Sequence, residues 1–155
     1  MIDLLKDTNI FKGLRSDELE KVVNISNIVE FHDRDQIFKA GDNATSLYIV
    51  CLGEVKLNIT VDHINTSIDL TIDSMKKGDI FGWSAITQPY KYKFSAYASG
   101  NTKLLHFQAD KMKILCDESD HIGYVIMNNI TAIISDRFTR TEGLLKHIIQ
   151  TTLEK

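Results

Sequence analysis

The spacing of apolar positions changes twice along the chain. Up to about residue 26 apolar residues recur at helical spacing, over 27–108 they alternate with polar residues, and over 109–155 the helical spacing returns. We therefore expect N-terminal helices, a middle segment of strands and C-terminal helices. Because 155 residues can bury one hydrophobic core, these segments are expected to form a single α+β domain.

Alternation in the middle segment is clearest at Val55, Leu57, Ile59 and Val61, and it recurs at Ile68, Leu70 and Ile72. Strands of this kind have one face in water. The run 47–52 is instead apolar on both faces, so we expect it at the centre of a sheet.

Glycines mark the expected joints between these strands. Gly41, Gly53, Gly78 and Gly100 each precede a polar residue. Glycine accepts the positive φ of tight turns at little cost, so we expect these residues to separate short strands. Short strands joined by tight turns predict an antiparallel β-roll of the jelly-roll or double-stranded β-helix kind.

Helix signals lie before the strands. Ser16, followed by Asp17 and Glu18, is expected to cap a helix over about 16–25. A shorter helix and a turn at Gly13 are expected before it.

Two helices are expected after the strands, a short one over 109–116 and a long one over about 121–153. No proline interrupts the long helix, and Gly143 would permit a bend. A helix of this length extends past a small β-roll, so part of its apolar face needs a partner. Packing within the subunit is one interpretation, but we expect a homodimer through this C-terminal helix.

Charge and composition narrow the expected partners. The formal net charge is -3 and the pI is about 5.9, so no overall positive field attracts nucleic acid or anionic lipid. The stretch 1–11 mixes charged and apolar residues, unlike a signal peptide or membrane span. We expect a cytoplasmic protein with no direct nucleic-acid or membrane partner. Cys51 and Cys116 lack metal-site spacing and are expected to be buried or half-buried thiols.

The segment 77–86, Lys-Gly-Asp-Ile-Phe-Gly-Trp-Ser-Ala-Ile, carries the candidate binding chemistry. Backbone amides that follow Gly82 can bind an anion, because a ligand can approach the backbone closely at a glycine. A glycine turn between two strands has the same pattern, so the motif alone leaves both interpretations open.

Six segments have an informative order and spacing along the chain. They are 9–14 (NIFKGL), 36–42 (QIFKAGD), 47–50 (LYIV), 53–57 (GEVKL), 78–82 (GDIFG) and 95–98 (SAYA). Together they resemble the cyclic-nucleotide-binding domain of the catabolite activator and FNR (Crp/Fnr) regulator family, over nearly all of the chain. The resemblance implies a β-roll flanked by N-terminal helices, a phosphate-binding cassette after Gly82, and a long C-terminal helix that forms the dimer interface.

Two positions depart from the family's pattern. Members that bind cyclic AMP have a ribose-binding glutamate after the cassette glycine, where this chain has Trp83. They also have a phosphate-binding arginine next to a Ser/Thr-Ala pair, where this chain has Phe94. A buried cyclic phosphate needs strong charge compensation, so we expect weakened cyclic AMP binding. The two aromatic rings either fill the pocket or offer surface to a flat ligand.

Ten candidate ligand contacts follow from the resemblance: Phe81, Gly82, Trp83, Ser84, Ala85, Phe94, Ser95, Ala96, Arg137 and Phe138. The amides of 83–85, with Ser95, are expected to hold a neutral or weakly anionic ligand. Lys91 or Lys93 is an alternative cation, although on a regular strand Lys93 points away from the face of Phe94.

The long helix supplies the last two candidates, Arg137 and Phe138, near the position that faces the purine in the family. Phe138 is expected to stack on a ligand, and Arg137 to contact an anion unless it is simply exposed to solvent. We assign no certain cofactor, and a cyclic nucleotide or another small ligand is the candidate.

The sequence also bears on functions other than ligand sensing. The family's transcription regulators continue into a helix-turn-helix domain, whereas this sequence ends at Lys155, so we expect no DNA-binding domain and an unidentified protein partner. The five histidines form no His-x-His pair and no Gly-x-Ser-x-Gly motif occurs, so we expect no enzyme. The alternatives are a haem sensor that uses His106 or His121, and a dimeric interaction module with a filled pocket.

Overall fold

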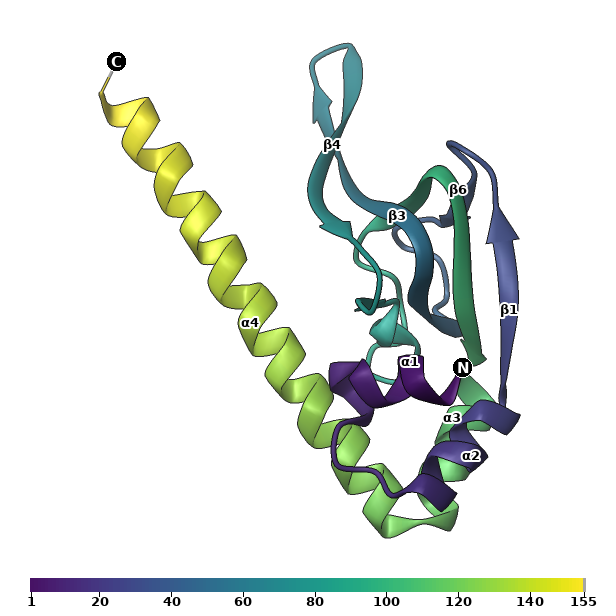
Figure 1. The fold of residues 1–155 in the computed structure, drawn as a ribbon. Coiled ribbons are helices and arrows are strands. Elements are labelled where there is room, and N and C mark those ends of the chain that lie inside the picture. The colour runs from purple at the N-terminus through teal and green to yellow at the C-terminus, as the bar shows by residue number, and fades with distance from the viewer. Residues whose placement is uncertain (155) are drawn as a thin grey trace.

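The computed structural model describes residues 1–154 and forms a β-roll between short helices and one long helix (Figure 1). Its elements are α1 (Ile2–Asp7), η1 (Asn9–Phe11), α2 (Ser16–Asn24), β1 (Ser26–Phe31), β2 (Gln36–Phe38), β3 (Ser46–His63), β4 (Thr66–Met75), β5 (Ile80–Phe81), η2 (Trp83–Ala85), β6 (Ser95–Gln108), α3 (Ala109–Glu118) and α4 (Asp120–Leu153). The predicted division into helices, strands and helices is confirmed.

The six strands form one antiparallel sheet that curls into a roll. Its main path runs β1-β6-β3-β4, while β2 pairs with β6 and β5 pairs with β3. The start of β3 lies at the centre, as predicted, and Leu47, Ile49 and Val50 are fully buried there. The prediction fails at the end of this run, because Leu52 is 56% exposed.

The four glycines have the predicted positive φ, but only two of them lie between strands. Gly41 and Gly78 occupy turns, whereas Gly53 lies inside β3 and Gly100 inside β6. The pairing of β3 with β6 shifts register around Gly53. A Cβ on Gly53 would lie 2.6 Å from the carbonyl oxygen of Asn101, so glycine allows the two strands to approach without a break.

A bulge in β4 changes which of its residues face the roll. Leu57 pairs with Asp73, but the next residue of β3, Asn58, pairs with Thr71, so Ile72 is an extra residue. One extra residue reverses the alternation of faces. Asp73 therefore shares the buried face of Leu57, although simple alternation would place it in solvent.

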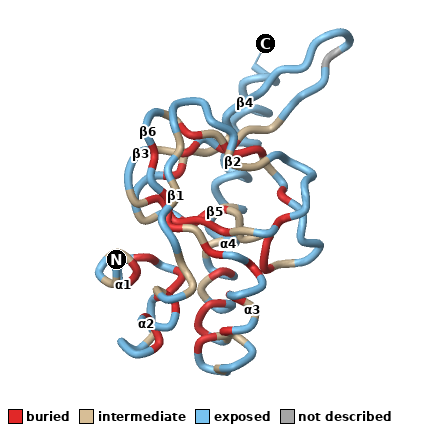
Figure 2. The backbone as a smooth tube through the Cα atoms, turned by 90° about the vertical axis from the view of Figure 1, so that its right-hand side faces the viewer, coloured by how far each residue is buried: buried red, intermediate tan, exposed pale blue. Residues whose placement is uncertain are grey.

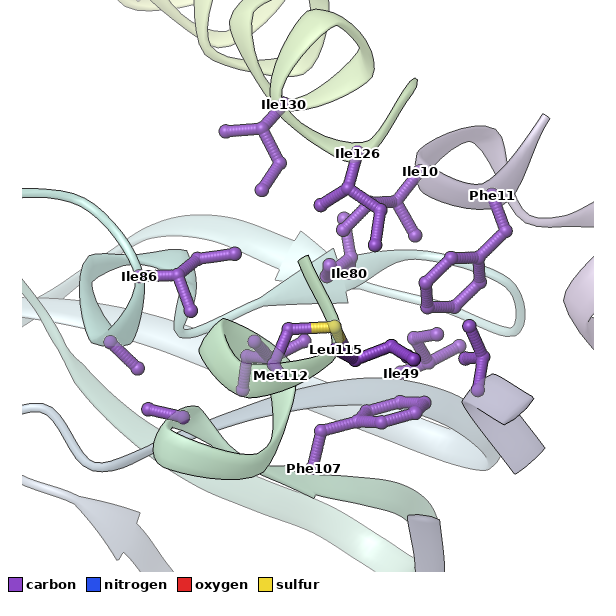
Figure 3. Close-up of a cluster of buried hydrophobic side chains, with 14 of the residues drawn as sticks. Ile10, Phe11, Ile49, Ile80, Ile86, Phe107, Met112, Leu115, Ile126 and Ile130 are labelled. Atoms are coloured by element: carbon purple, nitrogen blue, oxygen red, sulfur yellow. The ribbon is translucent and has the colours of Figure 1, made fainter. Parts of the chain in front are cut away.

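Two hydrophobic clusters form the core. The larger one lies where α2, α3 and the first turns of α4 cover the end of the roll (Figures 2 and 3). The smaller one fills the inside of the roll, around Val55, Leu57, Met75 and Phe81. Both ends of the chain thus contribute helices to the same core.

Polar contacts fasten the N-terminal helices to α4. Arg15, and not the predicted Ser16, is the N-cap of α2, because its amide donates to Glu18 Oε2 at 2.8 Å. Glu18 Oε1 also lies 2.8 Å from Nδ1 of His121 on α4. Burial raises the pKa of the Glu18 carboxyl, but the Arg15 amide and His121 together hold it below its ordinary value. Glu18 is therefore a buried carboxylate that joins α2 to α4.

The C-terminal half of α4 extends past the roll (Figure 1). Its large apolar side chains there are exposed in the single chain: Ile134, Phe138, Leu144, Leu145, Ile148, Ile149 and Leu153. No helix within residues 1–154 combines the length and apolar character needed to cross a bilayer. The exposed stripe is the one predicted to need a partner.

Candidate ligand pocket

A left-handed glycine sets the geometry of the candidate pocket. Gly82 joins β5 to the single-turn η2 with φ 78°. A Cβ at this position would lie 2.9 Å from the carbonyl oxygen of Ser46 on β3. The turn after β5 is therefore pressed against the central strand, and glycine is required for both its conformation and its contact.

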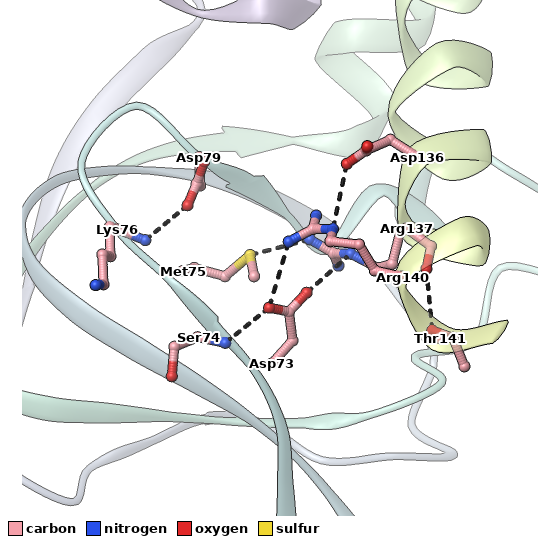
Figure 4. Close-up of polar contacts among 9 residues, drawn as sticks. All are labelled: Asp73, Ser74, Met75, Lys76, Asp79, Asp136, Arg137, Arg140 and Thr141. Carbon is pink, nitrogen blue, oxygen red and sulfur yellow. Dashed lines mark hydrogen bonds and ion pairs between the residues drawn. The ribbon is translucent and has the colours of Figure 1, made fainter. Parts of the chain in front are cut away.

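The side chains at this turn contact α4. The guanidinium carbon of Arg137 lies 4.2 Å from the centre of the Trp83 ring. Nε of Arg137 is 3.4 Å from Oδ2 of Asp73, and its Nη2 donates to the sulfur of Met75 at 3.0 Å (Figure 4). Arg140 also pairs with Asp73 and with Asp136. A network of opposite charges thus ties α4 to β4 beside the Gly82 turn.

Burial shapes the electrostatics of Arg137. Its side chain is only 13% exposed, and Nε has no hydrogen-bond partner of good geometry among the described residues. Burial lowers the pKa of Arg137, while Asp73 opposes that shift. The guanidinium nevertheless stays charged, since an arginine pKa remains far above neutral pH.

Little space remains at the Gly82 turn. The cavity there measures about 40 Å³. It is lined by Phe38, Leu57, Gly82, Trp83, Ser84, Tyr92, Lys93, Phe94 and Arg137. Small-molecule sites usually measure about 300–1,000 Å³. The side chains of the protein therefore fill most of this pocket.

A larger groove begins where this cavity ends. It measures about 480 Å³ and lies between the base of the β3–β4 hairpin and α4. Its lining is Leu57, Ile59, Ile72, Asp73, Phe94, Arg137, Arg140, Thr141, Leu144, Leu145 and Ile148. Most of these side chains are apolar, and the charged ones gather at the Asp73 end. The groove and the cavity share Leu57, Phe94 and Arg137.

Comparison with known families decides the class of domain. A family model described as the cyclic nucleotide-binding domain matches residues 28–119, which include all of the roll except the first two residues of β1. The chain belongs to this family. The curated relatives include the cGMP-dependent protein kinase isozyme 2, forms cD5/T2, of Drosophila melanogaster, which is 30% identical over 84 residues. Those residues are 54% of this chain but 9% of the kinase, so the match spans a small part of that protein.

Solved structures show the same fold. A cyclic nucleotide-binding domain from Methylobacillus flagellatus KT superposes with a TM-score of 0.78 at 18% identity, covering 94% of this chain and 80% of that one. The catabolite activator protein of Thermus thermophilus gives 0.75 at 22% identity, covering 91% and 63%. The predicted cyclic nucleotide-binding domain is thereby confirmed, and the predicted β-roll with it; the resemblance to Crp/Fnr regulators is confirmed as one of fold.

Five of the predicted ligand contacts line the small cavity of this cyclic nucleotide-binding domain. They are Gly82, Trp83, Ser84, Phe94 and Arg137. The structure thus brings the cassette, the segment before β6 and α4 together around one point. Their roles toward a ligand stay predictions.

The other five candidates do not line that cavity. Phe81 is fully buried against the rings of Tyr48 and Phe38, and Ala96 is buried inside the roll. The other three are Ala85, Ser95 and Phe138.

Each of these three has a physical reason for lying elsewhere. The amide of Ala85, predicted to be free, donates to Gly82 O at 3.1 Å, because η2 closes on itself. The hydroxyl of Ser95 accepts the amide of Ala40 at 3.0 Å. Phe138 is 70% exposed, because it follows Arg137 by one residue and so lies about 100° further around α4. Phe138 therefore lies outside the cavity, and its stacking role stays a prediction.

Lys93 is a pocket residue that regular alternation misplaces. It lines the cavity together with Phe94, because β6 begins only at Ser95 and the preceding residues are not in a strand. Asp73 is a second residue outside the prediction, since the bulge in β4 turns it inward. A one-residue insertion in a strand leaves no clear sequence signal, so the inward position of Asp73 could not be found from the pattern.

The histidines considered for haem ligation have other contacts. Both ring nitrogens of His106 are engaged, Nδ1 with Asn27 and Nε2 with Ser46, and burial lowers its pKa. Nδ1 of His121 contacts Glu18. Among the side chains that the structure describes, no cluster of three His, Cys, Asp or Glu residues is arranged to hold a metal ion. Cys51 and Cys116 are half-buried free thiols, as predicted.

Proposed function

We propose that this cyclic nucleotide-binding domain is a regulatory, ligand-sensing domain that does not bind cyclic AMP tightly. The observation that carries the proposal is the cavity of about 40 Å³ at the Gly82 turn, which Trp83 and Phe94 line and Arg137 covers. The general part of the proposal, a regulatory domain with the cyclic nucleotide-binding fold, is supported by the family match. The weak affinity follows from what fills the site.

Charge supports the same conclusion. Trp83 and Phe94 stand where family members that bind cyclic AMP have a ribose-binding glutamate and a phosphate-binding arginine. Neither of these two charged side chains is therefore present at its family position. A hydrogen bond to a charged group contributes about 1.5–3 kcal/mol, so its loss weakens binding by about tenfold to a hundredfold or more. Lys93 is exposed at the rim of the cavity, where water screens it, and Arg137 is already paired with Asp73.

Titration calorimetry tests the proposal. Cyclic AMP, cyclic GMP and cyclic dinucleotides are titrated into the wild-type chain, and no Kd tighter than about 1 μM is expected for cyclic AMP. A nanomolar Kd for cyclic AMP would overturn the argument from Trp83 and Phe94. Tight binding of another compound in the series would identify the ligand and leave the argument about cyclic AMP intact.

A second candidate function rests on α4. Its exposed stripe, which includes Ile134, Leu145 and Ile148, has no partner within the described residues. Apolar positions three and four apart on one helix are typical of a coiled-coil seam. We propose that α4 pairs with α4 of a second copy, so that the domain acts as a dimeric module on another protein. A cytoplasmic location stays a prediction.

A further inference from the structure

Arg137 reaches from α4 into the roll, and three contacts fix its guanidinium there. The Trp83 ring lies against one face, the Asp73 carboxylate pairs with Nε, and the Met75 sulfur accepts from Nη2. These partners lie on η2 and β4, so two separate elements hold the same group. A cation stacked on an aromatic ring and paired with a carboxylate has the geometry of a bound ligand.

The same side chain borders three cavities. Arg137 lines the cavity of about 40 Å³ at the Gly82 turn, the apolar groove of about 480 Å³, and a polar pocket of about 330 Å³ beside Asp79 and Asn129. The first two share two further residues, Leu57 and Phe94. Arg137 therefore stands at the point where the Gly82 cavity and the apolar groove meet.

We propose that Arg137 is the residue that decides what this pocket admits. Its guanidinium lies between the Gly82 turn and the groove and blocks passage from one to the other. An incoming ligand therefore enters only the groove, and the ligand that the groove takes is an uncharged apolar ring system. Removal of the guanidinium joins the two spaces and lets such a ligand reach Trp83. This inference rests on the proposed function, because it concerns how the same pocket excludes cyclic AMP.

Arg140 provides a matched comparison within the same charge network. It also pairs with Asp73, at 3.7 Å, and lines the same groove. Its side chain is 55% exposed, however, and it does not line the cavity at Trp83. A role in charge balance is thus common to both arginines, whereas the position between the two spaces belongs to Arg137. Asp73 retains one arginine partner when either is removed.

The chain reports on this site through its single tryptophan, Trp83. The uncharged probe N-phenyl-1-naphthylamine is titrated into the wild type, Arg137→Ala and Arg140→Ala, and acrylamide quenching of Trp83 is measured with and without the probe. For Arg137→Ala we expect probe binding at least about tenfold tighter than in the wild type, because the joined space buries more apolar surface. We also expect the bound probe to protect Trp83 from acrylamide in this variant alone.

Two results would overturn the proposal: an affinity of Arg137→Ala within about threefold of that of Arg140→Ala, or a bound probe that leaves Trp83 equally quenched. If Arg137→Ala has no cooperative thermal transition, Arg137→Gln is measured in the same way. Failure of both variants to fold would also contradict it, since Arg137 would then be a structural clamp. A nanomolar Kd of the wild type for cyclic AMP would instead refute the proposed function, so the two failures are distinguishable.

Discussion

Replacing Gly82 by alanine should destabilise the domain through two separate physical effects. The first is conformational, because an alanine at φ 78° adopts the left-handed region at a cost of about 1–2 kcal/mol. The second is steric, because its Cβ would lie 2.9 Å from Ser46 O and 3.4 Å from Phe38 Cε1. The Ser46 oxygen cannot retreat freely, since it also accepts the Tyr92 hydroxyl at 2.8 Å. Relief of such overpacking costs about 1–3 kcal/mol, so the total is about 2–5 kcal/mol.

Two other glycines separate these effects. Gly78 also has a positive φ, 89°, but an added Cβ meets nothing within 4 Å, so Gly78→Ala should lose only about 1–2 kcal/mol. Gly143 lies in α4 without a positive φ and with open space around it, so Gly143→Ala should gain about 0.5–1 kcal/mol. The free energy of unfolding should therefore decrease in the order Gly143→Ala, wild type, Gly78→Ala and Gly82→Ala.

Urea unfolding followed by far-UV circular dichroism measures this order, with all variants at one protein concentration. A change of 1 kcal/mol should move Tm by about 2–4 °C in a domain of this size. Equal losses for Gly82→Ala and Gly78→Ala, within about 0.5 kcal/mol, would refute the close approach of the cassette turn to β3.

Three further predictions concern contacts between the helices of one chain and between two copies of α4. Glu18 has a lowered pKa in the folded state, so its contribution to stability is present above its ordinary pKa and is lost as the pH falls below about 5. Glu18→Gln should therefore make the urea midpoint depend less on pH in this range. Equal slopes of urea midpoint against pH for the variant and the wild type would contradict this. The side-chain amide of Asn129 donates to Ile10 O and Lys12 O. Asn129→Ala should therefore lower the free energy of unfolding in urea by about 1–3 kcal/mol. A loss under about 0.5 kcal/mol would show that water replaces both bonds. Leu145→Ser should shift any dimer toward monomer in sedimentation velocity, and a wild type that is monomeric at all concentrations would exclude the α4 dimer.

Much of the fold could be predicted from the period of apolar residues. The alternation at Val55 and Leu57 and the helical spacing over 109–130 each reflect one face packed on a core, and the structure confirms both assignments. The same periods continue where no core lies beneath them, because Ile68 and Leu70 and the apolar residues of α4 from Ile134 onward are exposed. The breaks between strands were harder to predict. Gly53 and Gly100 have the positive φ of turn residues, yet they serve as irregularities inside long strands, because local conformation does not show whether hydrogen bonding continues past a glycine.

The candidate site was predicted in part for a related reason. The Gly82 turn is a local feature, so its position along the sequence identified it. The pocket walls depend on register and on long-range contacts: the bulge at Ile72 turns Asp73 inward, and the turn of α4 that meets the roll brings in Arg137 but leaves Phe138 in solvent. Nothing within a few residues of Arg137 indicates that its partner is Trp83.

The indole resonance of Trp83 tests the central claim most directly, because the chain contains one tryptophan and its ring lies under Arg137 in the closed pocket. Cyclic AMP is titrated into ¹⁵N-labelled protein while the indole N–H signal is followed. The shift, fitted against the free concentration of cyclic AMP, should give no Kd tighter than about 1 μM. A shift that saturates with a nanomolar Kd would show that the cyclic nucleotide enters the pocket, and would contradict the closure by Trp83, Phe94 and Arg137.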